Sequence, residues 1–233
     1  MIKPRSSSVT LLAAAAVLLG VSAAQAALTT EKCLAGKAKS WGKLRQCERG
    51  EHAKQLLGKP SNPATCQTKL QDKLAKFSAR ATEAAIACRY LDNGDQTITD
   101  FDTGLMWEKK DDAGGLHDKD GSFSWIVAMS DWLSEVNGHS DATNPKSPGF
   151  AGYSDWRLPD VAELQTILLA PDPCGTDPCI DAVFGPTAAD TTLSATTVAS
   201  TPTDVWSVNF SNGGLGTPPK VNSNQVRAVR RGF

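Results

Sequence analysis

The sequence predicts an α+β protein in which a helical segment precedes a segment of short strands and helices. Apolar residues recur at steps of three and four in residues 66–88, which is the period of one helix face. From residue 91 onward, short apolar runs alternate with turns rich in Asp, Asn and Gly, as they do between strands. A composition of 40% hydrophobic and 21% charged residues excludes a disordered chain and a polytopic membrane protein.

The first 26 residues have the pattern of a secretory signal peptide. Basic residues precede an apolar run from Val9 to Val21, and the segment ends in Ala24-Gln25-Ala26. The run is short for a bilayer span, and the small residues suit signal peptidase. We therefore expect Ala27 to begin a mature protein that is periplasmic or secreted and has no stable membrane span. An uncleaved anchor is the alternative.

An exported chain would carry its six cysteines into an oxidising compartment, where disulfides form. Four of them lie in residues 27–90 and two in residues 91–233, so each part can close its own bridges. The six are Cys33, Cys47, Cys66, Cys88, Cys174 and Cys179. This even division predicts a boundary near Tyr90 between a first domain, residues 27–90, and a second domain, residues 91–233.

The charge divides at the same boundary. Residues 27–90 hold 13 Lys and Arg against 5 Asp and Glu, whereas residues 91–233 hold 9 against 20. The two parts therefore carry net charges of +8 and −11, although the whole chain carries only −1. Such asymmetry indicates either an arm that binds an anionic polymer or a basic segment that rests on its own acidic neighbour.

The basic first domain is expected to form an antiparallel α-helical hairpin. One apolar face runs through Cys66, Leu70, Leu74, Phe77, Ala81, Ala84 and Cys88. The turn before it, residues 59–63, contains two prolines and an asparagine, which end one helix and begin the next. Residues 30–57 are rich in helix-forming side chains and should form the partner helix, with Thr30 as its cap.

Nesting the two helices pairs Cys33 with Cys88 and Cys47 with Cys66, although other connectivities stay open. The cysteines of the first helix are 14 residues apart and those of the second 22, so each pair shares a helix face. The axial distance between the two cysteines is about 12 Å longer in the second helix than in the first. This difference requires a break in the helices, for example at Gly50. A metal site is not expected, because no C-x-x-C spacing occurs and only one histidine, His52, is nearby.

A basic stripe lies beside the apolar face of the second helix. Its members are Lys69, Lys73, Lys76 and Arg80, at steps of four, three and four. This spacing is typical of a solvated face, and it also suits the binding of an anionic envelope polymer or lipid headgroup. No interleaved aromatic residues mark base stacking, so nucleic acid is not an expected partner.

Residues 91–110 are expected to open the second domain with a β-hairpin, because short apolar runs flank turns of Asp, Asn and Gly. Four aspartates lie in this segment, namely Asp92, Asp95, Asp100 and Asp102. They resemble a calcium loop, but Thr97 stands at the sixth position, where an EF-hand loop has glycine. Turn chemistry explains these aspartates better, and no metal or cofactor is expected.

Later residues complete the α+β pattern. One helix face should be buried through Trp125, Met129, Trp132, Leu133 and Val136. Residues 152–159 should form a strand that runs into a helix capped by Asp160 and Glu163. Residues 206–210 and 225–230 predict late strands on either side of a Gly-rich loop.

Taken in order, these motifs resemble the Lcl C-terminal domain family, named for the terminal domain of a collagen-like bacterial adhesin, over about residues 92–232. The matching residues are Asp92-Asn-Gly-Asp95, Thr103-Gly-Leu-Met-Trp107, Gly152-Tyr-Ser-Asp-Trp-Arg-Leu-Pro159, Glu163-Leu164, Ile180-Asp181, Phe184, Trp206 to Phe210, Val226-Arg227 and Val229-Arg230. The resemblance implies a C-type-lectin-like fold in which the first and last strands pair and long loops carry any binding site. It also implies an adhesin-like role, since adhesins of this family bind sulfated glycans.

The aromatic and charged residues of the family motif are expected to be structural. They are Trp107, Asp155, Trp156, Arg157, Pro159, Trp206 and Arg227, with Arg157 in a buried ion pair. Loops at residues 111–122, 139–149 and 211–220 are better candidates for ligand contact. Residues 192–196 read Thr-Leu-Ser-Ala-Thr where members of the family commonly have Tyr-Trp-Ser-Ser-Thr, so that loop lacks its aromatic surface.

The sequence contains no H-E-x-x-H, G-x-S-x-G or phosphate-loop motif. Cys174 and Cys179 support one enzymatic alternative, because formylglycine-generating enzymes share a lectin-like fold and use a cysteine pair with four intervening residues. A disulfide that pins a surface loop explains the pair without catalysis. We therefore expect an exported non-enzymatic binding protein of the bacterial cell envelope. Its ligand would be a glycan or another surface polymer, or anionic envelope material bound by the basic hairpin.

Overall fold

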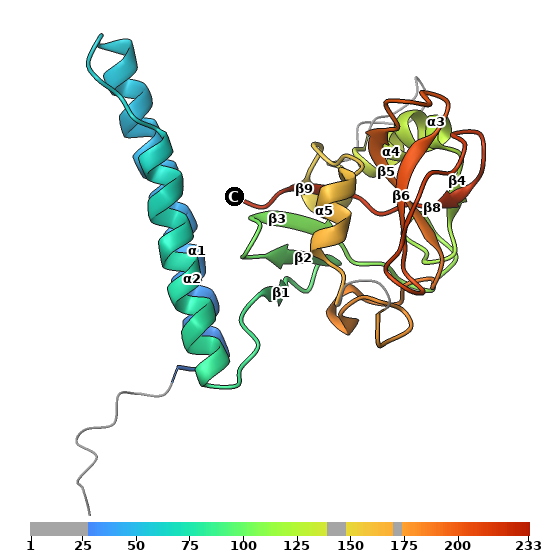
Figure 1. Ribbon diagram of the computed structural model, residues 1–233, viewed down its shortest axis with the longest axis horizontal. Helices are drawn as coiled ribbons and strands as arrows, with labels where there is room; N and C mark the ends of the chain where they lie inside the picture. The colour runs from blue at the N-terminus through green and yellow to red at the C-terminus, as the bar shows by residue number, and fades with distance from the viewer. Residues whose placement is uncertain (1–27, 139–147, 170–173) are drawn as a thin grey trace, which may run out of the picture.

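The computed structural model describes residues 28–138, 148–169 and 174–233. Figure 1 shows two long helices standing beside a body of strands and short helices. We call α1 (Thr30–Leu56) and α2 (Ala64–Glu83) the helical pair, and residues 90–233 the body. The mixed α+β class is confirmed. The predicted signal peptide and Ala27 lie outside the described residues.

The cap of the first helix is Thr29, one residue earlier than predicted. Thr29 is extended, and its hydroxyl accepts a hydrogen bond from the amide of Lys32 at 3.3 Å. This satisfies one of the amides that a helix start leaves without a partner. Thr30 is already helical, so its assignment as the cap is wrong.

The two helices lie side by side and antiparallel, and apolar residues fill the space between them. One cluster contains Leu44, Cys66, Leu70 and Leu74, and a second contains Cys33, Leu34, Ala81, Cys88 and Phe101. The helices approach closely at Gly36, where an added Cβ would collide with the ring of Phe77. Among the residues described, no helix has both the length and the apolar character needed to cross a bilayer.

Disulfides join Cys33 to Cys88 and Cys47 to Cys66, which are the pairs that nesting of the helices gives. The predicted break at Gly50 is wrong, because α1 continues through this residue without interruption. The difference in length is absorbed at the other helix, which ends at Glu83, so that Ala84 is exposed and Cys88 lies in the following segment.

A four-stranded antiparallel sheet lies next to the helical pair (Figure 1). Its strands, in spatial order, are β1 (Tyr90–Asp92), β2 (Thr97–Asp100), β3 (Leu105–Glu108) and β9 (Val229–Arg231). The predicted opening hairpin is β2 with β3. The last strand returns to pair with β3, not with the first strand.

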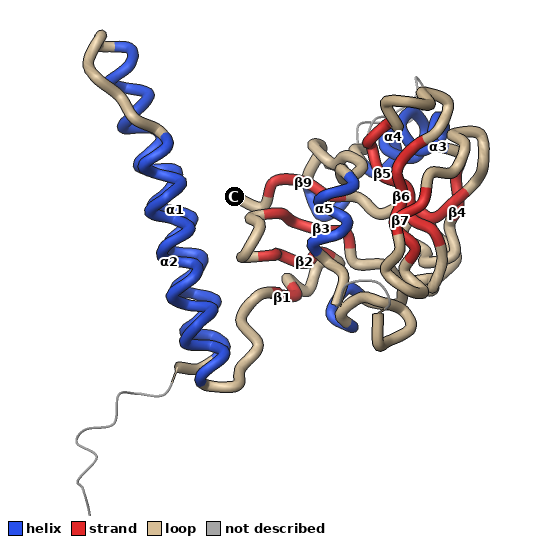
Figure 2. The backbone as a smooth tube through the Cα atoms, in the orientation of Figure 1, coloured by secondary structure: helices blue, strands red, loops and turns tan. Residues whose placement is uncertain are grey.

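A second sheet has the order β4-β8-β5-β6-β7 and is antiparallel except where β5 meets β8. Its strands lie on the side of the body away from the helical pair (red in Figure 2). Its strands are β4 (Ser122–Phe123), β5 (Thr191–Thr197), β6 (Val205–Asn209), β7 (Leu215–Gly216) and β8 (Asn224–Gln225). Residues 192–196, predicted as a loop, lie within β5. Thr192, Leu193 and Ser194 are buried there, so this part of the segment belongs to the core and not to a binding surface.

Short helices cover the second sheet. They are α3 (Trp125–Val127), a π-helical turn (Ala128–Trp132) and α4 (Leu133–Val136). The predicted face is buried at Trp132, Leu133 and Val136, but Met129 is exposed and Ala128 is buried. A π-turn spaces its hydrogen bonds five residues apart, so a period of 3.6 residues does not hold across it.

The segment before α5 (Val161–Thr166) is less regular than the sequence predicts. Residues 152–159 form no continuous strand: a 3₁₀ turn (Phe150–Gly152) comes first, and Arg157 alone bridges Val229. The cap of α5 is confirmed, because Asp160 and Glu163 form a reciprocal capping box. A further 3₁₀ turn follows later (Ala182–Phe184).

Candidate functional site

The helical pair attaches to the body through α1, which contacts the turn between β2 and β3. The ring of Trp41 stacks on Phe233 with centroids 5.2 Å apart, and its indole nitrogen donates to the carbonyl of Phe101 at 2.9 Å. Trp41 also covers Gly104, whose φ of 75° and lack of Cβ leave room for the ring. These contacts hold the chain's last residue against α1.

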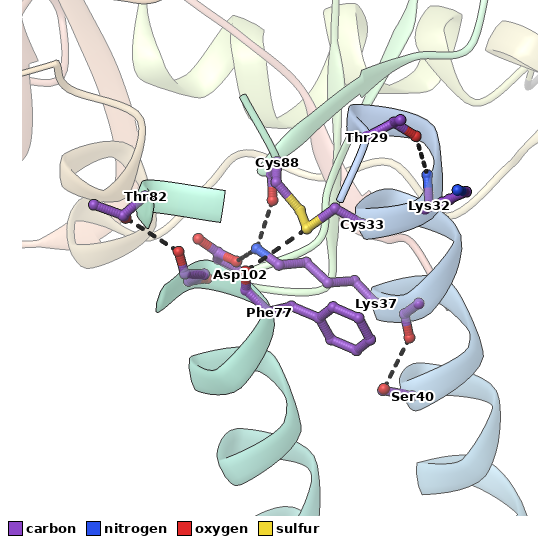
Figure 3. Close-up of a disulfide and its surroundings, with 11 residues drawn as sticks. Thr29, Lys32, Cys33, Lys37, Ser40, Phe77, Thr82, Cys88 and Asp102 are labelled. Atoms are coloured by element: carbon purple, nitrogen blue, oxygen red, sulfur yellow. Dashed lines mark hydrogen bonds and ion pairs between the residues drawn. A yellow bond between two sulfur atoms is a disulfide. The ribbon is translucent and has the colours of Figure 1, made fainter. Parts of the chain in front are cut away.

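A buried lysine completes this attachment. Figure 3 shows the side chain of Lys37 reaching the Cys33–Cys88 disulfide. The Lys37 ammonium donates to the carbonyl of Cys88 and to the carboxylate of Asp102, both at 2.5 Å. Because 1% of this side chain is exposed, both hydrogen bonds are needed to offset the loss of water around the charge.

The predicted basic stripe lies on the side of α2 away from the body. Its four side chains, those of Lys69, Lys73, Lys76 and Arg80, are all exposed. Ser78 and Thr82 flank the buried face of α2 on its other side, where they line a crevice with Asp102 of the body. The stripe therefore faces solvent and not the acidic body.

The stripe also lacks carboxylate partners. Within residues 28–138, 148–169 and 174–233, none of its four side chains lies within 4.0 Å of an acidic oxygen. Lys69 makes only a minor contribution to the lowered pKa of Glu51, after Lys54 and the amide of Asn62. Five cations of the body have carboxylate partners instead, namely Lys109, Lys110, Lys119, Arg157 and Arg230. Lys37 and Arg89 also pair with carboxylates of the body. The stripe is thus a row of charges that the fold leaves unneutralised.

A groove between α1 and α2 runs beside the stripe. Its volume is about 200 Å³, and its lining residues are Ser40, Lys43, Leu44, Cys47, Cys66, Lys69, Leu70 and Lys73. Lys43 of α1 faces Lys69 and Lys73 of α2 across an apolar floor formed by leucines and the disulfide. Reading each helix alone misses Lys43. The Cys47–Cys66 pairing could have identified it, because Lys43 lies one turn from Cys47.

A second cluster of charges is buried in the body at Glu108, whose side chain is inaccessible. Its carboxylate lies 2.9 Å from the Lys110 ammonium and 2.8 Å from His117 Nδ1, and it accepts the amide of Ala228 at 2.7 Å. Burial alone would raise the pKa of Glu108, but these partners lower it to about 2. The cluster ties β3 to the loop at residues 111–121 and to the segment before β9.

The model of the Lcl C-terminal domain family matches residues 96–230, which is more than half of the 233-residue chain. The chain belongs to the Lcl C-terminal domain family. No curated protein matches the chain. The family match begins between β1 and β2 and ends in β9, so the Lcl C-terminal domain corresponds to the body. The basic stripe lies outside it.

Most residues of the Lcl motif are packed in the body. Trp107, Trp156, Pro159 and Arg227 are buried, Trp206 is half-buried and Asp155 is exposed. The guanidinium of Arg227 donates to the backbone carbonyls of Glu108 and Phe184, at 2.6 and 3.3 Å. Burial lowers the pKa of Arg227 to about 10, and the charge of Glu108 opposes this shift.

Two further ion pairs involve this motif. Asp155 lies 2.6 Å from Arg230 in β9. Arg157 forms two hydrogen bonds of 2.7 Å with Glu163, but 43% of the arginine side chain is exposed. The prediction of a buried ion pair is therefore wrong, because Glu163 lies in the first turn of α5, at the surface.

The cysteine pair of the Lcl C-terminal domain is also bridged. Cys174 is joined to Cys179, and all six cysteines of the chain lie in described residues and form disulfides. The amide of Cys179 donates to Phe210 and that of Cys174 to Asn212, so the small loop is fixed beside β6. Of the predicted contact loops, residues 139–147 lie outside the described residues.

Proposed function

We propose that this protein is an exported, non-enzymatic, adhesin-like binding protein of the bacterial cell envelope that binds an anionic surface polymer through the basic stripe of α2. The observation that carries this proposal is the row of four exposed cations without carboxylate partners. Unneutralised cations on one face raise the local concentration of anions and make binding dependent on salt.

The spacing of the stripe favours a polymer over a small anion. Steps of four, three and four residues place its charges about 6, 4.5 and 6 Å apart along the helix axis, a total of about 17 Å. A chain of sulfated or phosphorylated sugars can contact several of these charges at once, whereas a single phosphate contacts one or two. The groove with Lys43 adds a charge across from Lys69.

The body is proposed to be a C-type-lectin-like domain. Its membership of the Lcl C-terminal domain family supports this assignment. The adhesin-like role rests on the same membership. The body is not proposed to bind a glycan, because Thr192, Leu193 and Ser194 are buried within β5 and residues 91–233 are acidic.

The proposal is non-enzymatic because the cysteines needed for thiol chemistry are bridged. A disulfide map of the purified exported protein tests this point. Three bridges and no alkylated cysteine are expected, whereas a reactive Cys174 or Cys179 would favour the thiol-dependent enzyme related to formylglycine-generating enzymes.

The binding site is tested with heparin and with polyphosphate as probes. We expect K69Q/K73Q to weaken binding by about tenfold or more at low salt, because it removes two adjacent charges from the stripe. R45Q/R49Q is the matched control, since it removes two exposed charges from α1 outside the stripe and groove. Equal losses in the two variants, or unchanged binding in K69Q/K73Q, would contradict the assignment.

A further inference from the structure

The end of the helical pair away from the body has no core of its own. We call residues 48–65, which lie beyond the Cys47–Cys66 disulfide, the tip. None of these residues is buried. Leu56 and Leu57 are 75% and 69% exposed, adjacent to each other. In Figure 1 the tip is the part of the helical pair that projects farthest from the sheets.

Backbone contacts fix the tip without help from these leucines. The amide of Lys59 donates to Lys54 and that of Gly58 to Gln55, which is a Schellman ending of α1, and Gly58 has a φ of 64°. The carboxylate of Glu51 also accepts the amide of Asn62 at 2.7 Å. Two large apolar side chains are therefore held in solvent by a stable turn that does not need them.

Basic residues surround the exposed leucines. Residues 48–65 contain three Lys and Arg against two Asp and Glu. Glu51 pairs with Lys54, and Glu48 accepts from Gln67. Within the described residues, Arg49 and Lys59 are therefore the exposed cations of the tip without a carboxylate partner. The tip thus presents two exposed leucines beside exposed basic residues, which is the composition of segments that lie at anionic membrane surfaces.

We propose that the tip docks on an anionic lipid bilayer, with Leu56 and Leu57 inserted among the acyl chains and Arg49 and Lys59 at the headgroups. A protein partner or a second copy would need about 800 Å² of contact on each side. A narrow convex turn with two leucines does not supply that area, whereas shallow insertion into lipid needs only these side chains and the charges beside them.

This site is separate from the polymer-binding stripe. With the tip in the bilayer, Lys69 to Arg80 lie about 8 to 24 Å farther along α2 from its first residue, beyond the headgroup contacts. The proposal therefore does not depend on polymer binding, and each can fail alone.

Vesicle co-sedimentation of the exported protein, whose loss of the leader is first checked by intact mass, tests the proposal. The probes are vesicles of phosphatidylethanolamine with phosphatidylglycerol and vesicles of pure phosphatidylcholine. We expect binding to the anionic vesicles, and we expect L56S/L57S to weaken it by about tenfold or more. L215S/V221S is the matched control, because it removes two exposed apolar side chains from the body and should bind as the parent does.

A second variant reports insertion directly. In L57W, the new indole should be quenched by brominated anionic lipid more strongly than the native tryptophans are. No binding by the parent, equal binding by L56S/L57S, or equal binding to both vesicle types would overturn the proposal. So would a parent dimer that L56S/L57S converts to monomer, since the leucines would then contact a second copy. Heparin binding by L56S/L57S should match the parent in every case.

Discussion

The ammonium of Lys37 in α1 lies 2.5 Å from the carboxylate of Asp102 in the turn between β2 and β3. Together with the pair of Arg89 and Asp100, this contact joins the basic first part of the chain to the acidic body. Residues 27–90 contain 13 cations, and in the described residues only Lys37 and Arg89 among them pair with carboxylates of the body. Contact within the molecule therefore accounts for little of the charge asymmetry.

We expect Lys37→Ala to lower the free energy of unfolding by about 2 to 4 kcal/mol, because it removes a buried side chain and leaves the Cys88 carbonyl without its donor. Denaturation in urea with the disulfides intact measures this loss. Lys39→Ala, at an exposed site two residues away, should change stability by less than about 0.5 kcal/mol. Similar losses in the two variants would contradict the role assigned to Lys37.

The buried Glu108 predicts how stability responds to acid. Its pKa is held at about 2, below the ordinary value of 4.5, so the folded state binds its proton less readily than the unfolded state does. The stabilisation is complete above about pH 4.5 and is lost as the pH falls toward 2. Stability curves of the parent and Glu108→Gln between pH 7 and 3 measure this contribution.

Glu108→Gln should cost about 3 to 5 kcal/mol near pH 7, because Lys110 then stays buried without its counter-charge. The difference between parent and variant should shrink as the pH falls below 4.5. Other carboxyls with lowered pKa, such as Glu163, are present in both chains and cancel in this comparison. A difference that is constant with pH would show that the stabilising role of Glu108 does not depend on its charge.

Local patterns predicted much of this structure. The repeat at Cys66, Leu70 and Leu74 predicted α2, and the Asp160–Glu163 spacing predicted the capping box of α5. Both depend on residues three or four apart, where sequence spacing fixes spatial neighbours. The four residues of the stripe also lie on one exposed face of α2, since they follow the same spacing.

Other features depend on contacts between distant residues. Nothing near Glu108 in the sequence shows that the amide of Ala228 will donate to its carboxylate. Lys43 joins the stripe only when α1 is placed against α2. The end of α2 was also predicted too late, because an apolar residue at Ala84 continues the period although the chain turns away there.

This early end of α2 supplies a stability prediction. Ala85 adopts a φ of 50°, and the amides of Ala85 and Ile86 donate to Thr82 and Ala81, which is a Schellman ending. A left-handed conformation costs an alanine about 1 kcal/mol relative to glycine. We expect Ala85→Gly to raise the free energy of unfolding by about that amount, as measured in urea.

Ala79→Gly is the control for this prediction. Ala79 is exposed in the interior of α2, where glycine should instead cost about 1 kcal/mol. The two substitutions are chemically identical, so opposite signs would show that backbone conformation decides the effect. A loss of stability in Ala85→Gly would mean that Ala85 does not adopt the left-handed conformation in solution.

Removing each of the two disulfides of the helical pair should lower the free energy of unfolding by a different amount. Cys33–Cys88 spans 55 residues and Cys47–Cys66 spans 19, so chain entropy predicts losses of about 4 and about 3 kcal/mol for the paired alanine variants.

Where the chain is destabilised is a sharper test than the size of the loss. The tip beyond Cys47–Cys66 has no buried residue, whereas Cys33–Cys88 lies in the cluster that joins the helices to Phe101. Without Cys47–Cys66, amide hydrogen exchange should therefore become faster in the tip alone. Without Cys33–Cys88, it should become faster at the end of the helices that holds this bridge and in the turn between β2 and β3. Faster exchange throughout the chain in both variants would show that the helical pair and the body unfold as one unit.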